Sequence, residues 1–224
     1  MPVVAFPLAV IVAVSMIKDL FEDNKRRQSD KQENLKKAWV YDRATRDYAE
    51  KLWQDIKVGD LIKVYCDEYL PADLLIVQSS ENKGVCYIET KNLDGETNLK
   101  HKLAVKRLNN ALNELEEVEE VLKGELACEP PNDQIYRFEG TYEANDRHLT
   151  LSSENILLRG SSIRNTGWVI GIAVYTGHQT KVMMNASKPK FKLSKLQKLT
   201  NRQIIYIFLV QTVVCGIAAT IATL

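Results

Sequence analysis

The stretch DLIKVYCDEYLPADLLIVQ, residues 60–78, contains two short β-rich runs separated by a turn signal. The runs Asp60–Tyr65 and Leu74–Gln78 are rich in Leu, Ile and Val, and each has the length of an ordinary strand. The turn signal Leu70–Asp73 includes Pro71, which interrupts a paired strand. The stretch therefore predicts two successive strands of a β-sheet.

Further short β-rich runs lie on both sides of this stretch, with turn signals at residues 58–60, 82–84 and 94–95. Helical spacing of apolar residues predicts one amphipathic helix over 109–123, and a short helix is predicted over Thr180–Ala186. Many short strands without strand–helix–strand alternation are typical of a β-sandwich, a jelly roll or a distorted barrel. The other predicted strands are Ala38–Tyr41, Val85–Glu89, Asn98–Val105, Gly124–Cys128, Tyr136–Tyr142, His148–Leu151, Ile163–Asn165 and Trp168–Tyr175.

Two uncharged runs, residues 1–17 and 203–224, flank the charge-rich middle of the chain. A bilayer-spanning helix needs about 20 apolar residues. The second run has that length, and the first falls slightly short, so we expect a truncated span there. A signal peptide is disfavoured because the run has no basic start and no small-residue cleavage site. Polar helix-forming residues 19–37 predict a solvated stalk that continues from the first span.

Basic residues cluster at the inner end of each uncharged run. Positive residues near the ends of spans remain in the cytosol, so these clusters predict that residues 18–202 are cytosolic. The clusters are Lys18, Lys25, Arg26 and Arg27 after the first run, and Lys188, Lys190, Lys192, Lys195, Lys198 and Arg202 before the second.

Composition excludes several classes of function. The formal net charge is +1, whereas nucleic-acid binders carry a basic excess, so we expect no nucleic-acid partner. The four cysteines, Cys66, Cys86, Cys128 and Cys215, form no CxxC pair and have no histidine at metal-ligand spacing. We therefore expect no metal site and no disulfide framework, and a reducing compartment.

The stretch LDGETNLK, residues 93–100, carries the candidate chemistry. Asp94-Gly95 is an ordinary turn signal, and a solvated turn remains one interpretation. However, a second carboxylate, Glu96, follows an apolar strand on a loop in which Gly95 allows the backbone to approach a partner closely. Glu96 is therefore a candidate general base that orients and deprotonates a water attacking an acyl phosphate formed elsewhere.

An ordered set of motifs resembles the actuator domain of P-type ATPases, and the wording of residues 94–100 resembles the type IV branch, the phospholipid-transporting flippases. The resemblance covers essentially the whole chain. Besides residues 94–100, it is carried by Lys18-Asp19, Phe21-Glu22-Asp23 with Arg26, Val58-Gly59-Asp60, Pro71-Ala72-Asp73-Leu74-Leu75, Leu158-Arg159-Gly160, Arg164-Asn165-Thr166-Gly167-Trp168, Tyr175-Thr176-Gly177-His178-Gln179-Thr180-Lys181 and Met184-Asn185.

The resemblance implies a membrane-anchored protein in which a β-rich, distorted jelly-roll actuator domain lies between two transmembrane and stalk helices. The implied parts are a span and stalk over 1–37, the actuator domain over 38–187, and a stalk and truncated span over 188–224. It also implies that Glu96 is catalytic in dephosphorylating an aspartyl phosphate on another domain. The implied loop-shaping residues are Asp94, Gly95, Thr97 and Asn98.

For the whole enzyme, the resemblance implies ATP-driven movement of phospholipid from the exoplasmic to the cytosolic leaflet. ATP and Mg²⁺ would bind outside this segment, because the phosphorylation and nucleotide domains are not in it, and the segment alone is expected to be inactive. The implied partners are phospholipid, the membrane, those two domains and an accessory β subunit. The implied location is the plasma membrane or the Golgi and endosomes.

Two alternatives remain open from the sequence. The chain could be the actuator domain of a P-type cation pump, against which the wording of the loop argues. It could also be a non-enzymatic membrane adaptor, in which residues 94–97 are a plain turn and Glu96 is dispensable.

Overall fold

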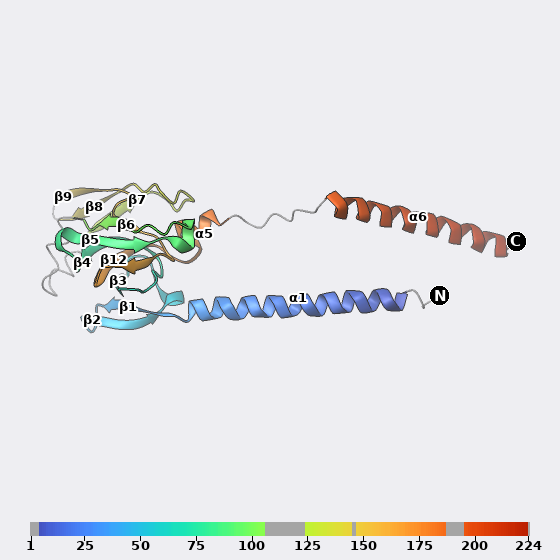
Figure 1. Cartoon of the computed structure of the whole chain (residues 1–224), viewed down its shortest axis with the longest axis horizontal. Coiled ribbons are helices and arrows are strands. Elements are labelled where there is room, and N and C mark those ends of the chain that lie inside the picture. Colours follow the sequence, from blue (N-terminus) through green and yellow to red (C-terminus); the bar gives the residue numbers. More distant parts are fainter. Residues whose placement is uncertain (1–4, 106–123, 145–146, 187–194, 224) are drawn as a thin grey trace. The chain divides into compact units, whose positions relative to one another are not determined.

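The computed structural model describes residues 5–105, 124–144, 147–186 and 195–223, which form two compact units. The first unit spans residues 1–186 and contains helix α1 (Ala5–Asn34) and a β-rich domain; the second spans 187–224 and contains helix α6 (Lys195–Thr223) (Figure 1). The helix predicted over 109–123 lies outside the described residues.

A six-stranded antiparallel sheet forms the centre of the β domain, with strand order β10-β4-β12-β3-β1-β2. Strands β3 and β4 come from the stretch 60–78, and β12 lies between them and pairs with both. The six strands are β1 (Lys37–Asp42), β2 (Asp47–Leu52), β3 (Leu61–Tyr65), β4 (Asp73–Ser79), β10 (Ile156–Leu157) and β12 (Trp168–Tyr175).

Two three-stranded antiparallel sheets complete the domain, with orders β11-β5-β6 and β7-β8-β9. Their strands are β5 (Val85–Glu89), β6 (Lys100–Leu103), β7 (Glu125–Cys128), β8 (Gly140–Ala144), β9 (Arg147–Leu151) and β11 (Ser162–Arg164). Short helices η1 (Trp53–Asp55), η2 (Asn82–Gly84) and α2 (Lys91–Asp94) lie between strands, and η3 (Gly177–Gln179) and α5 (Lys181–Asn185) follow β12.

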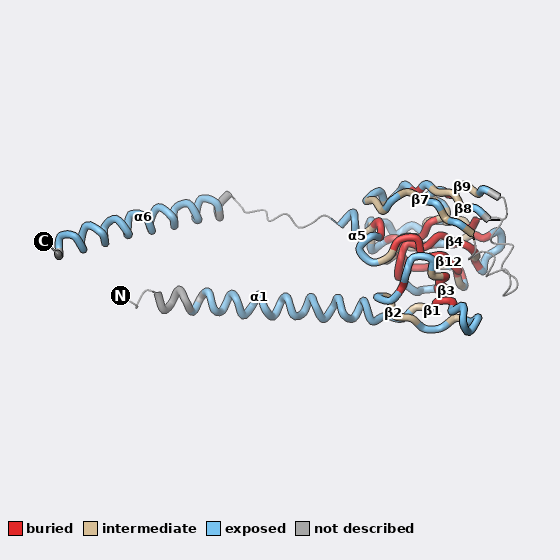
Figure 2. The backbone as a smooth tube through the Cα atoms, turned by 180° about the vertical axis from the view of Figure 1, so that it is seen from behind, coloured by how far each residue is buried: buried red, intermediate tan, exposed pale blue. Residues whose placement is uncertain are grey.

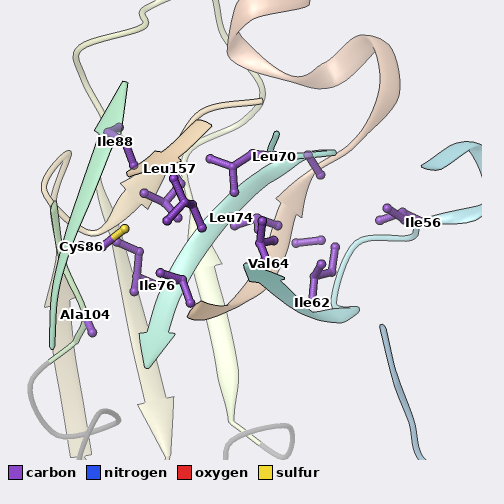
Figure 3. Packing of buried hydrophobic residues seen from close by; sticks show 14 of the residues in the cluster. Ile56, Ile62, Val64, Leu70, Leu74, Ile76, Cys86, Ile88, Ala104 and Leu157 are labelled. Atoms are coloured by element: carbon purple, nitrogen blue, oxygen red, sulfur yellow. The ribbon is translucent and has the colours of Figure 1, made fainter. Parts of the chain in front are cut away.

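The central sheet is covered on both faces, which explains why β4 is a continuous apolar run. Successive side chains of a strand point to opposite faces. Leu74 and Ile76 join one buried cluster that includes residues of β5 and β11 (Figure 3). Leu75 and Val77 join a second cluster that includes residues of β8 and β9. The six-stranded sheet therefore lies between the two smaller sheets.

Gly171 permits the close approach of β12 and β4. An added Cβ at this position would lie 2.9 Å from Leu74 Cβ and 3.0 Å from the Leu75 carbonyl oxygen. The register of the two strands also shifts between Ile170 and Gly171. A glycine is needed here because the neighbouring backbone leaves no room for a side chain.

The β-rich architecture predicted from the sequence is confirmed, with differences at particular elements. Strands β2 and β10 and helix α2 were not predicted. The strand expected from Tyr136 begins at Gly140, because residues 136–139 lie in a loop. The polar stretch 19–37 is helical to Asn34, and Lys37 already begins β1.

Buried residues concentrate in the β domain, whereas the described side chains of α1 and α6 are exposed (Figure 2). Within the described residues, one helical stretch, Lys198–Ile221, is long and apolar enough to cross a membrane, with a mean hydropathy of 2.3. The other predicted span, residues 1–17, lies partly outside the described residues.

Candidate functional site

Residues 93–99 lie in the connection between β5 and β6, and Lys100 begins β6. The sheet holds this connection at both ends because Ile88 of β5 pairs with Lys100. Helix α2 forms a single turn at the start of this loop. Gly95 ends that turn in the left-handed conformation, with a φ of 76°, and its N–H donates to the Lys91 carbonyl at 3.0 Å. No atom crowds a Cβ built at Gly95, so the glycine is required for its backbone angle rather than for space.

Asp94 is the acceptor that organises the loop. The Thr90 hydroxyl lies 3.0 Å from both carboxylate oxygens, and the Glu96 N–H donates to Oδ1 at 3.0 Å. The Lys100 ammonium donates to Oδ2. The bond to the N–H two residues on is the Asx turn that makes aspartate common in tight loops. Asp94 thus ties together the start, the tip and the end of the loop.

The charges of this cluster reinforce one another. Partial burial acts to raise the pKa of Asp94, but hydrogen bonds from Lys100, from the Glu96 N–H and from Thr90 outweigh it and lower that pKa. Partial burial likewise acts to lower the pKa of Lys100, but hydrogen bonds to Asp94 and Glu96 outweigh it and raise that pKa. Both groups are therefore charged at neutral pH.

Glu96 lies at the tip of the loop, and its side chain is 56% exposed. Its Oε2 lies 2.9 Å from Lys100 Nζ, and the neighbouring Gly95, Thr97 and Asn98 are exposed. An exposed carboxylate on an ordered loop can accept a proton from a water molecule brought by a docking partner. The structure thus brings together Asp94, Gly95 and Glu96, and gives no side-chain contact for Thr97 or Asn98.

Two residues around the loop were not assigned a role from the sequence. Lys100 is the last residue of the stretch LDGETNLK. Its closeness in sequence to Asp94 and Glu96 is the only feature of the sequence that indicates ion pairs with them. Tyr136 comes from the distant loop before β8: its ring centroid lies 5.4 Å from Lys100 Nζ, and its hydroxyl lies 3.5 Å from Asp94 Oδ2. Nothing local in the sequence indicates that Tyr136 reaches this loop.

A second cluster, buried around Asp73 at the start of β4, joins three of the motif stretches. Asp73 is 0% exposed and accepts the backbone N–H groups of Arg159, at 2.8 Å, and Lys181, at 2.7 Å. Burial raises the pKa of Asp73 to about 6, although the two N–H groups partly offset this shift. The Lys181 ammonium is also buried and donates to Glu129 Oε1 at 2.8 Å and Asn132 Oδ1 at 2.7 Å.

Metal ligands do not gather in the described parts of the chain: no group of three or more His, Cys, Asp or Glu side chains there could hold a metal ion.

Comparison with known proteins gives a consistent result, although no family model matches the chain. The chain is 43% identical over 221 residues to phospholipid-transporting ATPase DRS2 of Saccharomyces cerevisiae, covering 95% of this chain and 16% of that protein. It is 40% identical over 214 residues to phospholipid-transporting ATPase VB of Homo sapiens, covering 95% and 14%. It is 40% identical over 216 residues to phospholipid-transporting ATPase 1 of Arabidopsis thaliana, covering 96% and 18%.

The chain is therefore homologous to phospholipid-transporting ATPases along nearly all of its length, which confirms the resemblance found in its motifs. It spans less than a fifth of the length of these curated relatives. Their names do not favour the cation-pump alternative.

Proposed function

We propose that this chain, a homologue of phospholipid-transporting ATPases, is the actuator segment of a longer enzyme of that kind. Its loop Glu96 promotes hydrolysis of an aspartyl phosphate carried by another domain of the same protein. The observation that carries the proposal is the placement of Glu96: an exposed carboxylate at the tip of a loop that Asp94 and the β5–β6 pairing hold in order.

The proposed step is the hydrolysis of an aspartyl phosphate, with Glu96 as the general base. Water attacks phosphorus, the bond between phosphorus and the aspartate oxygen breaks, and the aspartate leaves as a carboxylate. The proton released by the attacking water passes to the Glu96 carboxylate, which returns it to solvent after the domains separate. A positioned general base contributes about 10²- to 10⁴-fold to such a step.

Membrane anchoring and orientation are part of the proposal. The exposed apolar stretch Lys198–Ile221 has the length and hydropathy of a transmembrane helix, and the uncharged run 1–17 supplies a second span. The basic clusters at their inner ends put the β domain in the cytosol. We assign residues 1–37 to the first span and stalk, 38–187 to a distorted jelly-roll actuator domain, and 188–224 to the second stalk and span.

The remaining components lie beyond this segment. We propose that ATP and Mg²⁺ bind to the phosphorylation and nucleotide domains of the same longer protein, and that the transported phospholipid moves from the exoplasmic to the cytosolic leaflet. An accessory β subunit is a further proposed partner, and the plasma membrane or the Golgi and endosomes are the proposed locations. The β domain contributes the dephosphorylating loop and the connection to the membrane helices.

The test is Glu96→Gln in the longer protein that contains this segment. The amide keeps the size of the side chain but cannot accept the proton, so the phosphorylated enzyme should decay about 10²- to 10⁴-fold more slowly and accumulate. Rapid-chase measurement of acid-stable phosphoenzyme reports the decay. Phosphoenzyme formation from ATP should be unchanged.

Glu81→Gln is the matched control, because Glu81 is an exposed carboxylate of the same domain outside the loop. It should leave decay unchanged. Wild-type decay in Glu96→Gln would contradict the proposed role of Glu96. Failure of the longer wild-type protein to form any phosphoenzyme from ATP would instead favour the adaptor alternative, in which residues 94–97 are only a turn.

A further inference from the structure

We propose that Lys100 has two successive roles in this loop: its ammonium holds Glu96 in place before docking and then binds an oxygen of the incoming phosphoryl group, which frees the Glu96 carboxylate to act on water. This inference rests on the proposed function of Glu96 and adds a specific residue and a specific exchange of partners to it.

The backbone of Lys100 is fixed more firmly than that of Glu96. Lys100 begins β6 and pairs with Ile88 of β5, so the sheet determines where its side chain starts. Its side chain is only 27% exposed, and the Tyr136 ring lies against the ammonium, with 5.4 Å between Nζ and the ring centroid. A charge anchored in this way can hold a carboxylate that sits on a loop.

The ammonium bridges two carboxylates that would otherwise repel each other. Nζ contacts Asp94 Oδ2 and lies 2.9 Å from Glu96 Oε2. With Lys100 present, the three groups carry a net charge of −1; without it, two negative charges would face the docking partner. A phosphoryl group is itself an anion, so the lysine lowers the electrostatic cost of its approach.

The donor count permits the proposed exchange. A lysine ammonium has three N–H donors, and the two described carboxylate contacts use two of them. The third can bind a phosphoryl oxygen as the loop docks. Because Asp94 is the more buried carboxylate and is also held by Thr90, Glu96 is the partner that is released.

The test compares Lys100→Met, which keeps the length of the chain but removes the charge, with Lys100→Arg, which keeps the charge. Both are made in the longer protein, and decay of the phosphoenzyme is measured. Lys100→Met loses a charge-assisted hydrogen bond, so its phosphoenzyme should decay about 10-fold more slowly than that of the wild type. Lys100→Arg should recover to within about threefold of the wild type, since guanidinium also binds carboxylates and phosphate.

Two further variants separate positioning from general loss of structure. Lys91→Met is the matched control: Lys91 begins α2 on the same loop, and its ammonium has no described contact with Asp94 or Glu96, so decay should be unchanged. The double variant Glu96→Gln/Lys100→Met should decay more slowly than Glu96→Gln alone, but by less than the product of the two single effects. The hold on Glu96 no longer matters in that background, whereas the contact with the phosphoryl oxygen is still lost.

The outcomes distinguish this inference from the function on which it rests. Wild-type decay in Lys100→Met, equal slowing in Lys100→Met and Lys100→Arg, or additive slowing in the double variant would each overturn the role of Lys100 while Glu96→Gln remains slow. Wild-type decay in Glu96→Gln would instead overturn the proposed function itself.

Discussion

Asp73 and Asp94 are two aspartates of one domain, each with a lysine close by, and they are held in opposite ways. Asp73 is fully buried and accepts two backbone N–H groups, and burial raises its pKa to about 6. Asp94 lies on a surface loop, where hydrogen bonds from Lys100, the Glu96 N–H and Thr90 outweigh partial burial and lower its pKa.

The difference shows that the surroundings of an aspartate, rather than its residue type, decide the direction in which its pKa shifts. At Asp73, desolvation outweighs the hydrogen bonds and raises the pKa, whereas at Asp94 the hydrogen bonds outweigh desolvation. The two N–H groups that Asp73 accepts connect the start of β4 to Arg159 and to the first residue of α5. Near the surface, water remains available to the Asp94 and Glu96 carboxylates, as the proposed exchange of partners by Lys100 requires. Substitutions in the Asp73 cluster and in the Asp94 cluster should therefore differ in their effect on the free energy of unfolding and in its pH dependence.

The largest expected effect is that of Lys181→Met, which removes the buried cation and leaves Glu129 without it. Breaking a buried ion pair from one side costs about 4 kcal/mol of the free energy of unfolding. Urea unfolding of the purified chain, followed by tryptophan fluorescence, measures the loss. Lys100→Met is the matched surface variant and should cost less than about 1 kcal/mol; equal losses would contradict the distinction between the clusters.

The next effect is a pH dependence that comes from Asp73. Its folded-state pKa of about 6 is above the unfolded value of about 3.9, so the folded state binds more protons between these values. The wild type should therefore lose up to about 3 kcal/mol of stability, relative to Asp73→Asn, as the pH rises from about 4 to about 6. Urea unfolding of both proteins across this pH range measures the difference in their free energies of unfolding. A difference that does not change with pH would refute the prediction.

The smallest effect belongs to Asp94→Ala, which removes the acceptor of an exposed loop and should cost about 1 kcal/mol. Its pH dependence has the opposite sign. The folded-state pKa of Asp94 is lowered, so its stabilisation is present above the unfolded pKa of about 3.9 and is lost as the pH falls through the folded value. The two aspartates should therefore give opposite pH dependences. If the wild type lost stability on acidification relative to both Asp73→Asn and Asp94→Ala, this prediction would be wrong.

Local patterns were enough to predict the inner strands of the fold and the loop at residues 93–100. The run Leu74–Val77 is apolar at every position because both faces of β4 are buried, and its position after a proline turn located the strand. Strand β2, with the sequence DYAEKL, was missed because an edge strand needs little apolar surface. Strand β10 has only two residues, too few for a pattern.

In the candidate site, the sequence indicated Glu96 but not the contacts around it. The hydrogen bonds of Asp94 are local, and an aspartate before a glycine is a known turn signal. Tyr136 is 42 residues from Asp94 in the chain, and Lys181 is 108 from Asp73. Such contacts depend on how the sheets pack, which no short motif records.

The two edge strands of the six-stranded sheet, β2 and β10, affect how readily the domain aggregates. On one side, β2 carries Asp47, Glu50 and Lys51 along its length; on the other, β10 is only two residues long. Charges and brevity are the two features that discourage an extended foreign chain from adding itself as another strand. Both edges of the sheet are thereby protected against pairing with an extended segment of another protein.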